Sequence, residues 1–326
     1  DVPLCTFLSG GIDSSAISAI VAAVYREQGK TLTTYSVDYQ ENDKYFKSSL
    51  FQPTADADFI KLMTSYIGSD HHNLVVDNYS LAEALDPAVL ARDLPGMADV
   101  DSSLYILCKE IRKDFVISLS GECSDEIFGG YPWFRKTELL NTNTFPWSLS
   151  LSERSSILSK ELKNLPLDEY ARSHYEKTLK EVPHLPGENP EEDRMREIVY
   201  LNIKWFMVNL LNRKDRMSMA NSLEVRVPFA DKRLVQYAFN VPNSIRFADN
   251  MEKGLLRRAL QGILPEEILK RKKSPYPKTH NPEYTNIVSS RLENLISNPE
   301  LTILALIDKK GQKFKHWTAE EKYKVI

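Results

Sequence analysis

Cysteine is scarce in this chain of 326 residues, which contains only Cys5, Cys108 and Cys123. Their number is odd, they lie far apart, and no CxxC or Cys/His spacing occurs among them. These features argue against a disulfide framework and against a zinc site. A reducing, cytoplasmic location is therefore the simplest expectation, because thiols stay reduced there.

An excess of charge of one sign is also missing. The 42 Lys and Arg residues nearly balance the 45 Asp and Glu residues, and the net charge is -3 at pH 7. Such a chain shows no electrostatic footprint for nucleic acid or for an anionic membrane. No apolar run of about 18 residues and no signal-peptide pattern occurs either. We expect a soluble protein without nucleic-acid or membrane partners and, since the chain begins at Asp1, a fragment.

Short apolar runs alternate with amphipathic segments over the first 135 residues, and long helical patterns follow. This alternation is typical of βαβ units around a parallel sheet. We predict an α/β fold, with a doubly wound parallel sheet in residues 1–135 and a mainly helical part in residues 136–326 that packs on this core and returns residues to the site. The expected strands are residues 4–8, 32–37, 73–76 and 115–119. The expected helices are residues 14–26, 59–66, 81–91, 103–112, 192–211 and 255–260.

A glycine turn follows the first expected strand, in the stretch Phe7–Ser15 that reads FLSGGIDSS. Gly10 and Gly11 let the backbone approach an anion closely, and the start of the next helix supplies positive potential. The turn is not a Walker loop, because the pattern GxxxxGK[ST] is absent. An ordinary turn that caps a helix remains an alternative for two glycines alone. Asp13 is the unusual residue, since a carboxylate repels a phosphate.

A second turn of the same kind occurs in Phe115–Glu126, which reads FVISLSGECSDE. Ligands of open parallel sheets bind at the carboxyl ends of the strands, so the two turns are expected to face one crevice. Asp13 and Asp125 would then suit Mg²⁺, which takes one or two protein carboxylates together with phosphate oxygens. For either aspartate alone, a helix cap or a first-turn acid is an equally good interpretation.

Three stretches resemble a known family. SGGIDSS resembles the pyrophosphate-binding signature SGGxDS of the ATP pyrophosphatase (PP-loop) superfamily. SGECSDEIFGGY and LEVRVPFADKR resemble the SGEGSDExFGGY and VExRVPFLD stretches of the glutamine-hydrolysing asparagine synthetase family. The likeness runs over essentially the whole chain, in family order. It implies a fold of the adenine nucleotide alpha hydrolase-like (HUP) type and the C-terminal synthetase domain, without the family's N-terminal glutaminase domain in this chain.

The resemblance implies an ATP-dependent amide ligase. With ATP and Mg²⁺, it would adenylate the side-chain carboxylate of aspartate, giving β-aspartyl-AMP and pyrophosphate, and ammonia would then give asparagine. A glutaminase domain or subunit would supply the ammonia. The resemblance is also compatible with a homodimer. Pro95–Ser103 (PGMADVDSS) replaces a threonine-rich stretch of better-known members. That departure leaves open another carboxylate-adenylating ligase or cyclase, similar to β-lactam synthetase, and a non-catalytic nucleotide-binding protein is a further alternative.

The resemblance also implies site residues. Glu122 would orient ammonia or accept its proton, and Lys273 would stabilise charge on the α-phosphate, although the basic residues 270–272 leave the register of this lysine open. The metal ligands would be Asp13 and Asp125. The residues expected to contact ATP or pyrophosphate are Leu8, Ser9, Gly10, Gly11, Asp13, Ser14, Ser15, Val37, Ser120 and Gly121.

Overall fold

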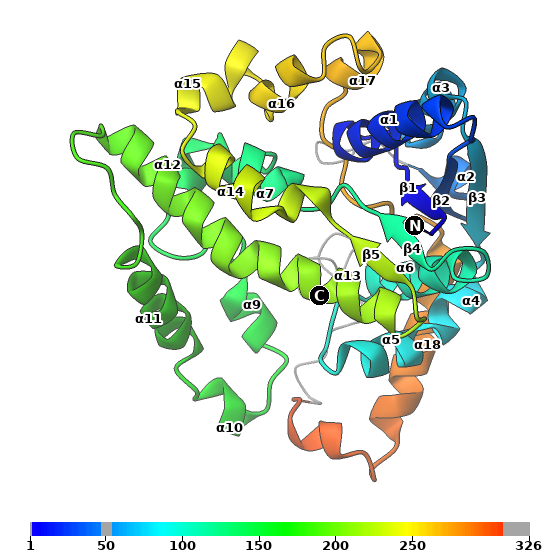
Figure 1. Cartoon of the computed structure of the whole chain (residues 1–326). Coiled ribbons are helices and arrows are strands. Elements are labelled where there is room, and N and C mark those ends of the chain that lie inside the picture. The colour runs from blue at the N-terminus through cyan, green and yellow to red at the C-terminus, as the bar shows by residue number, and fades with distance from the viewer. Residues whose placement is uncertain (1, 47–53, 309–326) are drawn as a thin grey trace. The chain divides into compact units, whose positions relative to one another are not determined.

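The structure, a computed structural model, describes residues 2–46 and 54–308. Its core is one five-stranded sheet in which every neighbouring pair of strands runs parallel. The strand order is β3-β2-β1-β4-β5 (Figure 1). The predicted α/β fold with a parallel sheet is therefore confirmed. The strands are β1 (Leu4–Phe7), β2 (Thr33–Tyr39), β3 (Asp70–Val76), β4 (Ile117–Leu119) and β5 (Glu224–Arg226).

Helices connect the first four strands, as the alternating pattern predicts. They are α1 (Ile12–Glu27), α2 (Asn42–Tyr45), α3 (Ala57–Ile67), α4 (Asn78–Glu83), α5 (Leu85–Arg92) and α6 (Ala98–Ile111). The single helix expected over residues 81–91 is in fact two, α4 and α5, which meet at Ala84. Figure 1 shows α1 and α3 on one side of the sheet and α5 and α6 on the other. This placement follows from right-handed crossovers that change direction after β3.

The remaining helices follow β4. They are α7 (Ser124–Phe128), α8 (Thr137–Leu140), α9 (Leu151–Ser155), α10 (Lys160–Lys163), α11 (Leu167–Leu179), α12 (Pro190–Leu201), α13 (Val208–Met219), α14 (Lys232–Phe239), α15 (Asn243–Arg246), α16 (Gly254–Ala259), α17 (Glu266–Lys270) and α18 (Pro282–Ser297). A π-helical segment, Asn202–Met207, joins α12 to α13. Within the described part of the chain, no helix is long and apolar enough to cross a membrane.

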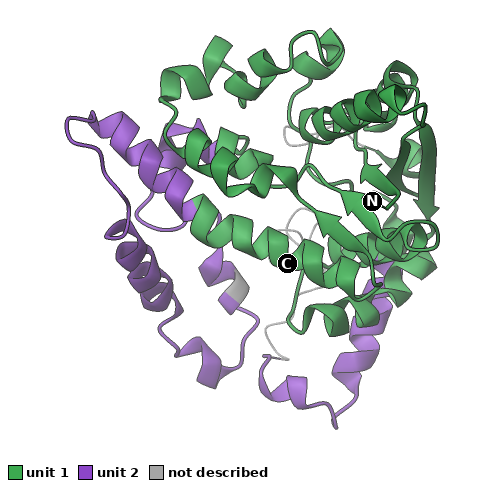
Figure 2. Ribbon diagram, viewed as in Figure 1, with its two compact units in different colours: residues 1–131, 202–284 green, residues 132–201, 285–326 purple. Residues whose placement is uncertain are grey.

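The chain divides into two compact units (Figure 2). Unit 1 comprises residues 1–131 and 202–284, and unit 2 comprises residues 132–201 and 285–326. The chain leaves unit 1 after residue 131. It returns to unit 1 at residue 202, because β5 pairs with β4 and extends the sheet. The part expected to be one helical region is therefore shared between the two units.

The strand order places a topological switch between β1 and β4. From β1 the chain runs outward to β2 and β3, and it then returns to β4 on the other side of β1. In register, Thr6 of β1 stands opposite Leu119 of β4, so the two strands end at the same edge. Ligands of open α/β sheets bind at such a point, outside the carboxyl ends of the strands. Both glycine turns singled out in the sequence follow these two strands.

One hydrophobic cluster anchors the two turns. It joins Leu8, directly after β1, to Ile12 and Ala16 of α1 and to Ile127 of α7. All four side chains are buried. Burial of apolar surface is worth roughly 25 cal/mol per Å², so removing any of these side chains would loosen a turn as well as the core. The turns are therefore held by packing before any ligand binds.

Candidate active site

The turn after β1 is built from glycine and hydroxyl side chains. Gly10 has a φ of 67°, and a Cβ on it would lie 2.6 Å from Cβ of Phe59, so no other residue fits there. Ser14 Oγ lies 3.0 Å from Ser9 Oγ and accepts a hydrogen bond from the Ser9 N–H at 3.1 Å. Gly11 caps α1, whose first backbone N–H groups point out of the helix end. The result is a tight loop with an anion-attracting helix terminus.

The two glycine turns touch each other. A Cβ on Gly121 would lie 2.6 Å from the backbone nitrogen of Ser14 and 2.7 Å from the carbonyl carbon of Asp13. Only a residue without a side chain permits this approach. The two turns therefore lie against each other at the ends of neighbouring strands. Cys123, which stands where the family signature has glycine, adopts a φ of 73°, a region that glycine occupies most readily.

A cluster of ions joins the turns. The Lys253 ammonium lies 2.6 Å from Asp13 Oδ2 and 2.6 Å from Asp125 Oδ1. The Lys273 ammonium lies 2.6 Å from the other oxygen of Asp125. The structure thus brings together three residues singled out in the sequence, Asp13, Asp125 and Lys273. It adds Lys253, which sequence reasoning missed because no motif surrounds it.

The lysines control the ionisation of this cluster. Burial alone would raise the pKa of Asp125, but the charges of Lys253 and Lys273 outweigh burial and lower that pKa to about 2. Burial would likewise lower the pKa of Lys253, but the carboxylates of Asp125 and Asp13 outweigh it and raise that pKa. Asp125 and Lys253 therefore stabilise each other in their charged forms.

The two aspartates suit a hard cation. Asp13 Oδ1 is buried and has no hydrogen-bond partner within residues 2–46 and 54–308. An orphaned carboxylate oxygen of this kind is costly unless a ligand satisfies it. No group of three or more His, Cys, Asp and Glu side chains that could hold a metal occurs in the described ranges. A metal here would therefore need ligands from a bound phosphate, as Mg²⁺ commonly does.

Glu122 points into a second charged cluster. Its Oε1 lies 3.3 Å from the Lys214 ammonium and 3.5 Å from Nη2 of Arg213. The Lys214 side chain is 5% exposed, and its ammonium lies 4.4 Å from the ring centroid of Phe7 in β1. Lys214 and Arg213 were not among the residues predicted for the site. No motif or periodic pattern surrounds these two residues, so the sequence alone does not point to them.

The segment Pro95–Ser103 contains an acidic residue, Asp101, that forms a buried ion pair with Arg92. Asp101 Oδ2 lies 3.5 Å from Nη1 of Arg92, and both side chains are buried. Burial raises the pKa of Asp101, and the charges of Arg213 and Arg92 offset only part of that rise. A Cβ on Gly96 would lie 1.9 Å from Asp101 Oδ2, so glycine is required beside this ion pair.

The four basic side chains of residues 270–273 differ in their exposure and in their partners. Lys270 pairs with Glu266 on the surface, and Lys272 is exposed. Arg271 is buried, and its Nη1 donates a hydrogen bond to the carbonyl oxygen of Ser9 at 3.0 Å. Lys273 alone of the four reaches Asp125. This geometry favours the predicted register of the lysine.

Four further residues predicted to contact the nucleotide are buried. Leu8 and Ser120 are buried, and their backbone N–H groups donate hydrogen bonds to the carbonyls of Tyr35 and Arg226 at 2.8 and 3.0 Å. Val37 is buried in β2. Ser15 is fully buried in α1, and its hydroxyl has no partner in the ranges the structure describes.

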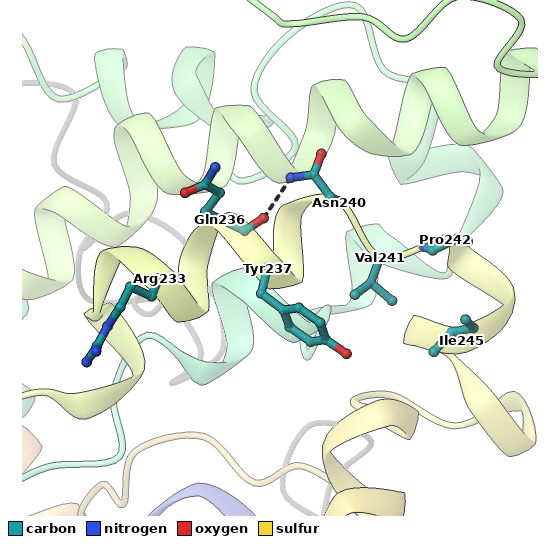
Figure 3. A pocket seen from close by; sticks show the side chains of 7 residues that line it. All are labelled: Arg233, Gln236, Tyr237, Asn240, Val241, Pro242 and Ile245. Carbon is teal, nitrogen blue, oxygen red and sulfur yellow. Dashed lines mark hydrogen bonds between the residues drawn. The ribbon is translucent and has the colours of Figure 1, made fainter.

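A shallow groove lies elsewhere on unit 1, along α14 and the turn into α15 (Figure 3). Its volume is about 570 Å³, and Tyr237, Val241 and Ile245 supply its apolar lining. Asn240 Nδ2 donates a hydrogen bond to the carbonyl of Gln236 at 2.8 Å beside it. None of the residues predicted for the site lines this groove. The chemistry-bearing residues gather instead at the switch point of the sheet.

Comparisons with known proteins identify the family of this chain. The family profile described as asparagine synthase matches residues 1–321. Asparagine synthetase (glutamine-hydrolyzing) 3 of Bacillus subtilis strain 168 is 56% identical over 312 residues, which is 95% of this chain and 50% of that protein. Asparagine synthetase (glutamine-hydrolyzing) 1 of the same strain is 28% identical over 92% of this chain and 50% of its own length.

A fungal relative has a different description from the two asparagine synthetases. Amidase chyE of Penicillium rubens is 29% identical over 85% of this chain and 49% of its own length. The chain thus spans about half the length of the curated relatives it matches. The profile match over nearly every residue, together with the 56% identity, shows that the chain belongs to the asparagine synthase family.

Proposed function

We propose that this chain is the synthetase part of an asparagine synthetase, which joins ammonia to the side-chain carboxylate of aspartate at the expense of ATP. The observation that carries the proposal is the convergence of Asp13, Asp125, Lys253 and Lys273 between two touching glycine turns. The cluster combines cations for phosphate oxygens with carboxylates for a metal, at the sheet edge where nucleotides bind. Family membership supports the same activity.

In this proposal, the turn after β1 holds the β- and γ-phosphates of ATP. The helix terminus of α1 attracts their charge, and the ammonium groups of Lys253 and Lys273 lie within the same crevice. Mg²⁺, held by Asp13 and Asp125 together with phosphate oxygens, would supply the remaining positive charge. The adenosine would lie against the backbone at Leu8 and Ser120, at the ends of β1 and β4.

The first chemical step forms the acyl adenylate. An oxygen of the aspartate side-chain carboxylate attacks the α-phosphorus, the bond to the bridging oxygen breaks, and pyrophosphate leaves with the electron pair. Lys273 would stabilise the charge that develops on the phosphate oxygens, and its contact with Asp125 supports that role. Its neighbour Tyr131 fixes its position, because the Lys273 ammonium lies 4.9 Å from the centroid of the Tyr131 ring.

The second step forms the amide. Ammonia attacks the activated carbonyl carbon, loses a proton, and displaces AMP. Glu122 lies at the turn after β4 and would orient the ammonia or accept that proton. Lys214 and Arg213 hold one of its oxygens, whereas Glu122 Oε2 is buried without a hydrogen-bond partner in the described part of the chain. That second oxygen is the one available to a reactant.

We further propose that a glutaminase domain or subunit delivers the ammonia in a cytoplasmic setting. The two Bacillus subtilis relatives are described as glutamine-hydrolysing, and this chain covers half of the length of each. Cys5, Cys108 and Cys123 are all buried, so none of them offers an accessible nucleophile for the hydrolysis of glutamine. Burial raises the pKa of each of these thiols, which further disfavours the reactive thiolate.

A second carboxylate substrate has one observation in its favour. Asp101, in residues 95–103, forms a buried ion pair with Arg92. Better-known members of the family have a threonine-rich stretch at these positions. A ligase or cyclase that adenylates another carboxylate would use the same phosphate site with a different wall. The two candidates differ only in the acid that they activate.

Incubation with ATP, MgCl₂, aspartate and ammonium chloride tests the proposal. We expect AMP, pyrophosphate and asparagine in equal amounts, and no AMP when aspartate is omitted. Glutamine in place of ammonium should give no asparagine with this chain alone. Pyrophosphate release that does not depend on aspartate would favour the other carboxylate-activating ligase, and ADP as the nucleotide product would contradict adenylation altogether.

A further inference from the structure

The Lys253 ammonium stands between the two carboxylates that are proposed to hold the metal. We propose that Lys253 takes the place of the metal in the nucleotide-free protein, so that a divalent cation enters the Asp13–Asp125 pair only together with pyrophosphate or a nucleotide. The proposal rests on the function proposed above and adds an order of binding to it. Its evidence is the geometry and charge of the cluster.

The distances leave no room for both cations. Lys253 Nζ is 2.6 Å from one oxygen of each aspartate, which is contact distance for a charged hydrogen bond. A Mg²⁺ ion bound to the same oxygens would require spacings of about 2.0–2.1 Å. An ammonium and a metal ion that share both oxygens would overlap. Metal binding to these two oxygens therefore requires that Lys253 move away.

The lysine bridge is built into the fold. Lys253 has a φ of 55°, which is uncommon for a residue with a side chain, and its side chain is 3% exposed. A Cβ on Gly130 would lie 2.5 Å from Lys253 Cε and 1.7 Å from Asp125 Oδ1. Glycine at position 130 thus leaves the space that the bridge occupies. Backbone strain and a dedicated glycine indicate a specific arrangement of these three residues.

The charge balance explains why a ligand would be needed. Asp13 and Asp125 are matched by Lys253 and Lys273, so the cluster is neutral. A divalent cation alone would leave two uncompensated positive charges in a largely buried site, which is unfavourable. Pyrophosphate brings negative charge and oxygen acceptors. The Lys253 ammonium can then bind phosphate oxygens and release the carboxylates to the metal.

Thermodynamic linkage makes this exchange measurable. If pyrophosphate draws Lys253 away, it must tighten the binding of the cation, and the cation must tighten pyrophosphate by the same factor. Substituting Lys253 by methionine removes the competing charge and retains most of the side-chain volume. The methionine variant should therefore bind a divalent cation without any phosphate ligand.

Titration with Mn²⁺, followed by electron paramagnetic resonance, tests the proposal on the whole chain. Without pyrophosphate, we expect the dissociation constant of Mn²⁺ to be at least about tenfold lower for Lys253→Met than for wild type. The double variant Lys253→Met/Asp13→Asn should lose this gain. Lys270→Met, which removes a surface lysine paired with Glu266, should behave like wild type. Equal Mn²⁺ affinity of wild type and Lys253→Met would overturn the proposal.

Thermal unfolding of the wild-type protein gives a second measurement that does not need a variant. Mg²⁺ alone should leave the melting temperature unchanged, whereas Mg²⁺ with pyrophosphate should raise it by more than pyrophosphate alone. A rise with Mg²⁺ alone that pyrophosphate does not increase would contradict the proposal. Neither readout depends on turnover. A chain that makes asparagine but binds Mn²⁺ equally well with and without Lys253 would refute this inference and leave the proposed function intact.

Discussion

Gly121 lies against the backbone of Ser14, so closely that a Cβ on Gly121 would be 2.6 Å from the Ser14 nitrogen. This contact joins the turn after β4 to the turn after β1. It sets the spacing between the proposed phosphate loop and the residues that act on the reacting groups. The crevice therefore depends on a position that has no side chain.

Gly121→Ala should separate the two turns. We expect kcat/KM for ATP to fall about a hundredfold, because misplacement by about 1 Å is enough for such a loss. Overpacking should also lower the free energy of unfolding by about 1–3 kcal/mol. Steady-state kinetics and urea unfolding measure the two effects. Gly29→Ala is the control, since Gly29 also has a positive φ but meets no atom within 4 Å; if both variants lost equal activity, the contact at Gly121 would not be the cause.

Lys273→Met should reduce the rate far more than the affinity for ATP. Its ammonium is proposed to act when charge develops on the α-phosphate, and an interaction made mainly in the transition state affects kcat. We expect kcat to fall by about a hundredfold or more, with a small change in the dissociation constant of ATP. Lys272→Met is the matched control, because Lys272 is the exposed neighbour. A larger loss in Lys272→Met would show that the register is off by one.

Glu122→Gln should separate the two partial reactions. The carboxylate is proposed to act on ammonia, so amide formation should fall about a hundredfold. Aspartate-dependent exchange of labelled pyrophosphate into ATP, which reports the adenylation step, should change much less. The ratio of the two rates is the measurement, and each serves as the control for the other. Equal losses in both reactions would place Glu122 in adenylation or in the structure.

Glu126→Gln should change how stability depends on pH. Glu126 is 1% exposed, and burial together with the charge of Asp125 raises its pKa from the ordinary value of 4.5 to about 7. Between these values the folded protein holds a proton that the unfolded chain has released, so the free energy of unfolding falls as pH rises. The full fall is about 3 kcal/mol.

Glutamine at position 126 keeps an oxygen acceptor for the Tyr131 hydroxyl and has no proton to lose. Urea unfolding of Glu126→Gln between about pH 5 and about pH 8 should therefore show less loss of stability than the wild type. Glu110→Gln is the control, because Glu110 forms only an exposed pair with Lys113. A wild-type slope that persists in Glu126→Gln would contradict the assignment.

The sequence predicts the sheet-forming half of the fold because its local patterns are strong. The first four strands and the helix after β1 are found close to their expected positions. Ile17, Ile20, Val21 and Val24 share one face of that helix by their spacing, yet Ile20 and Val24 are half exposed. Alanines such as Ala16 and Ala19 form the buried face instead. Small residues allow close packing but carry little hydrophobic signal.

Other features depend on contacts that a local pattern does not encode. Strand β5 has three residues with two exposed side chains, too short for an alternating pattern to be seen. Lys253 forms a hydrogen bond with Asp13, although the two residues are 240 positions apart in the sequence. Glycine turns, in contrast, are visible because their backbone geometry restricts the residue type. The predicted Asp13, Asp125 and Lys273 meet because these turns follow neighbouring strands of the sheet.

Isotope transfer tests the central claim, adenylation of the substrate carboxylate, most directly. The chain is incubated with ATP, MgCl₂, ammonium chloride and aspartate whose side-chain carboxylate carries ¹⁸O, and the nucleotide product is analysed by mass spectrometry. The account predicts one ¹⁸O atom in each AMP, because the attacking carboxylate oxygen remains on the α-phosphorus when ammonia displaces AMP. AMP without label, or label in inorganic phosphate together with ADP, would contradict it.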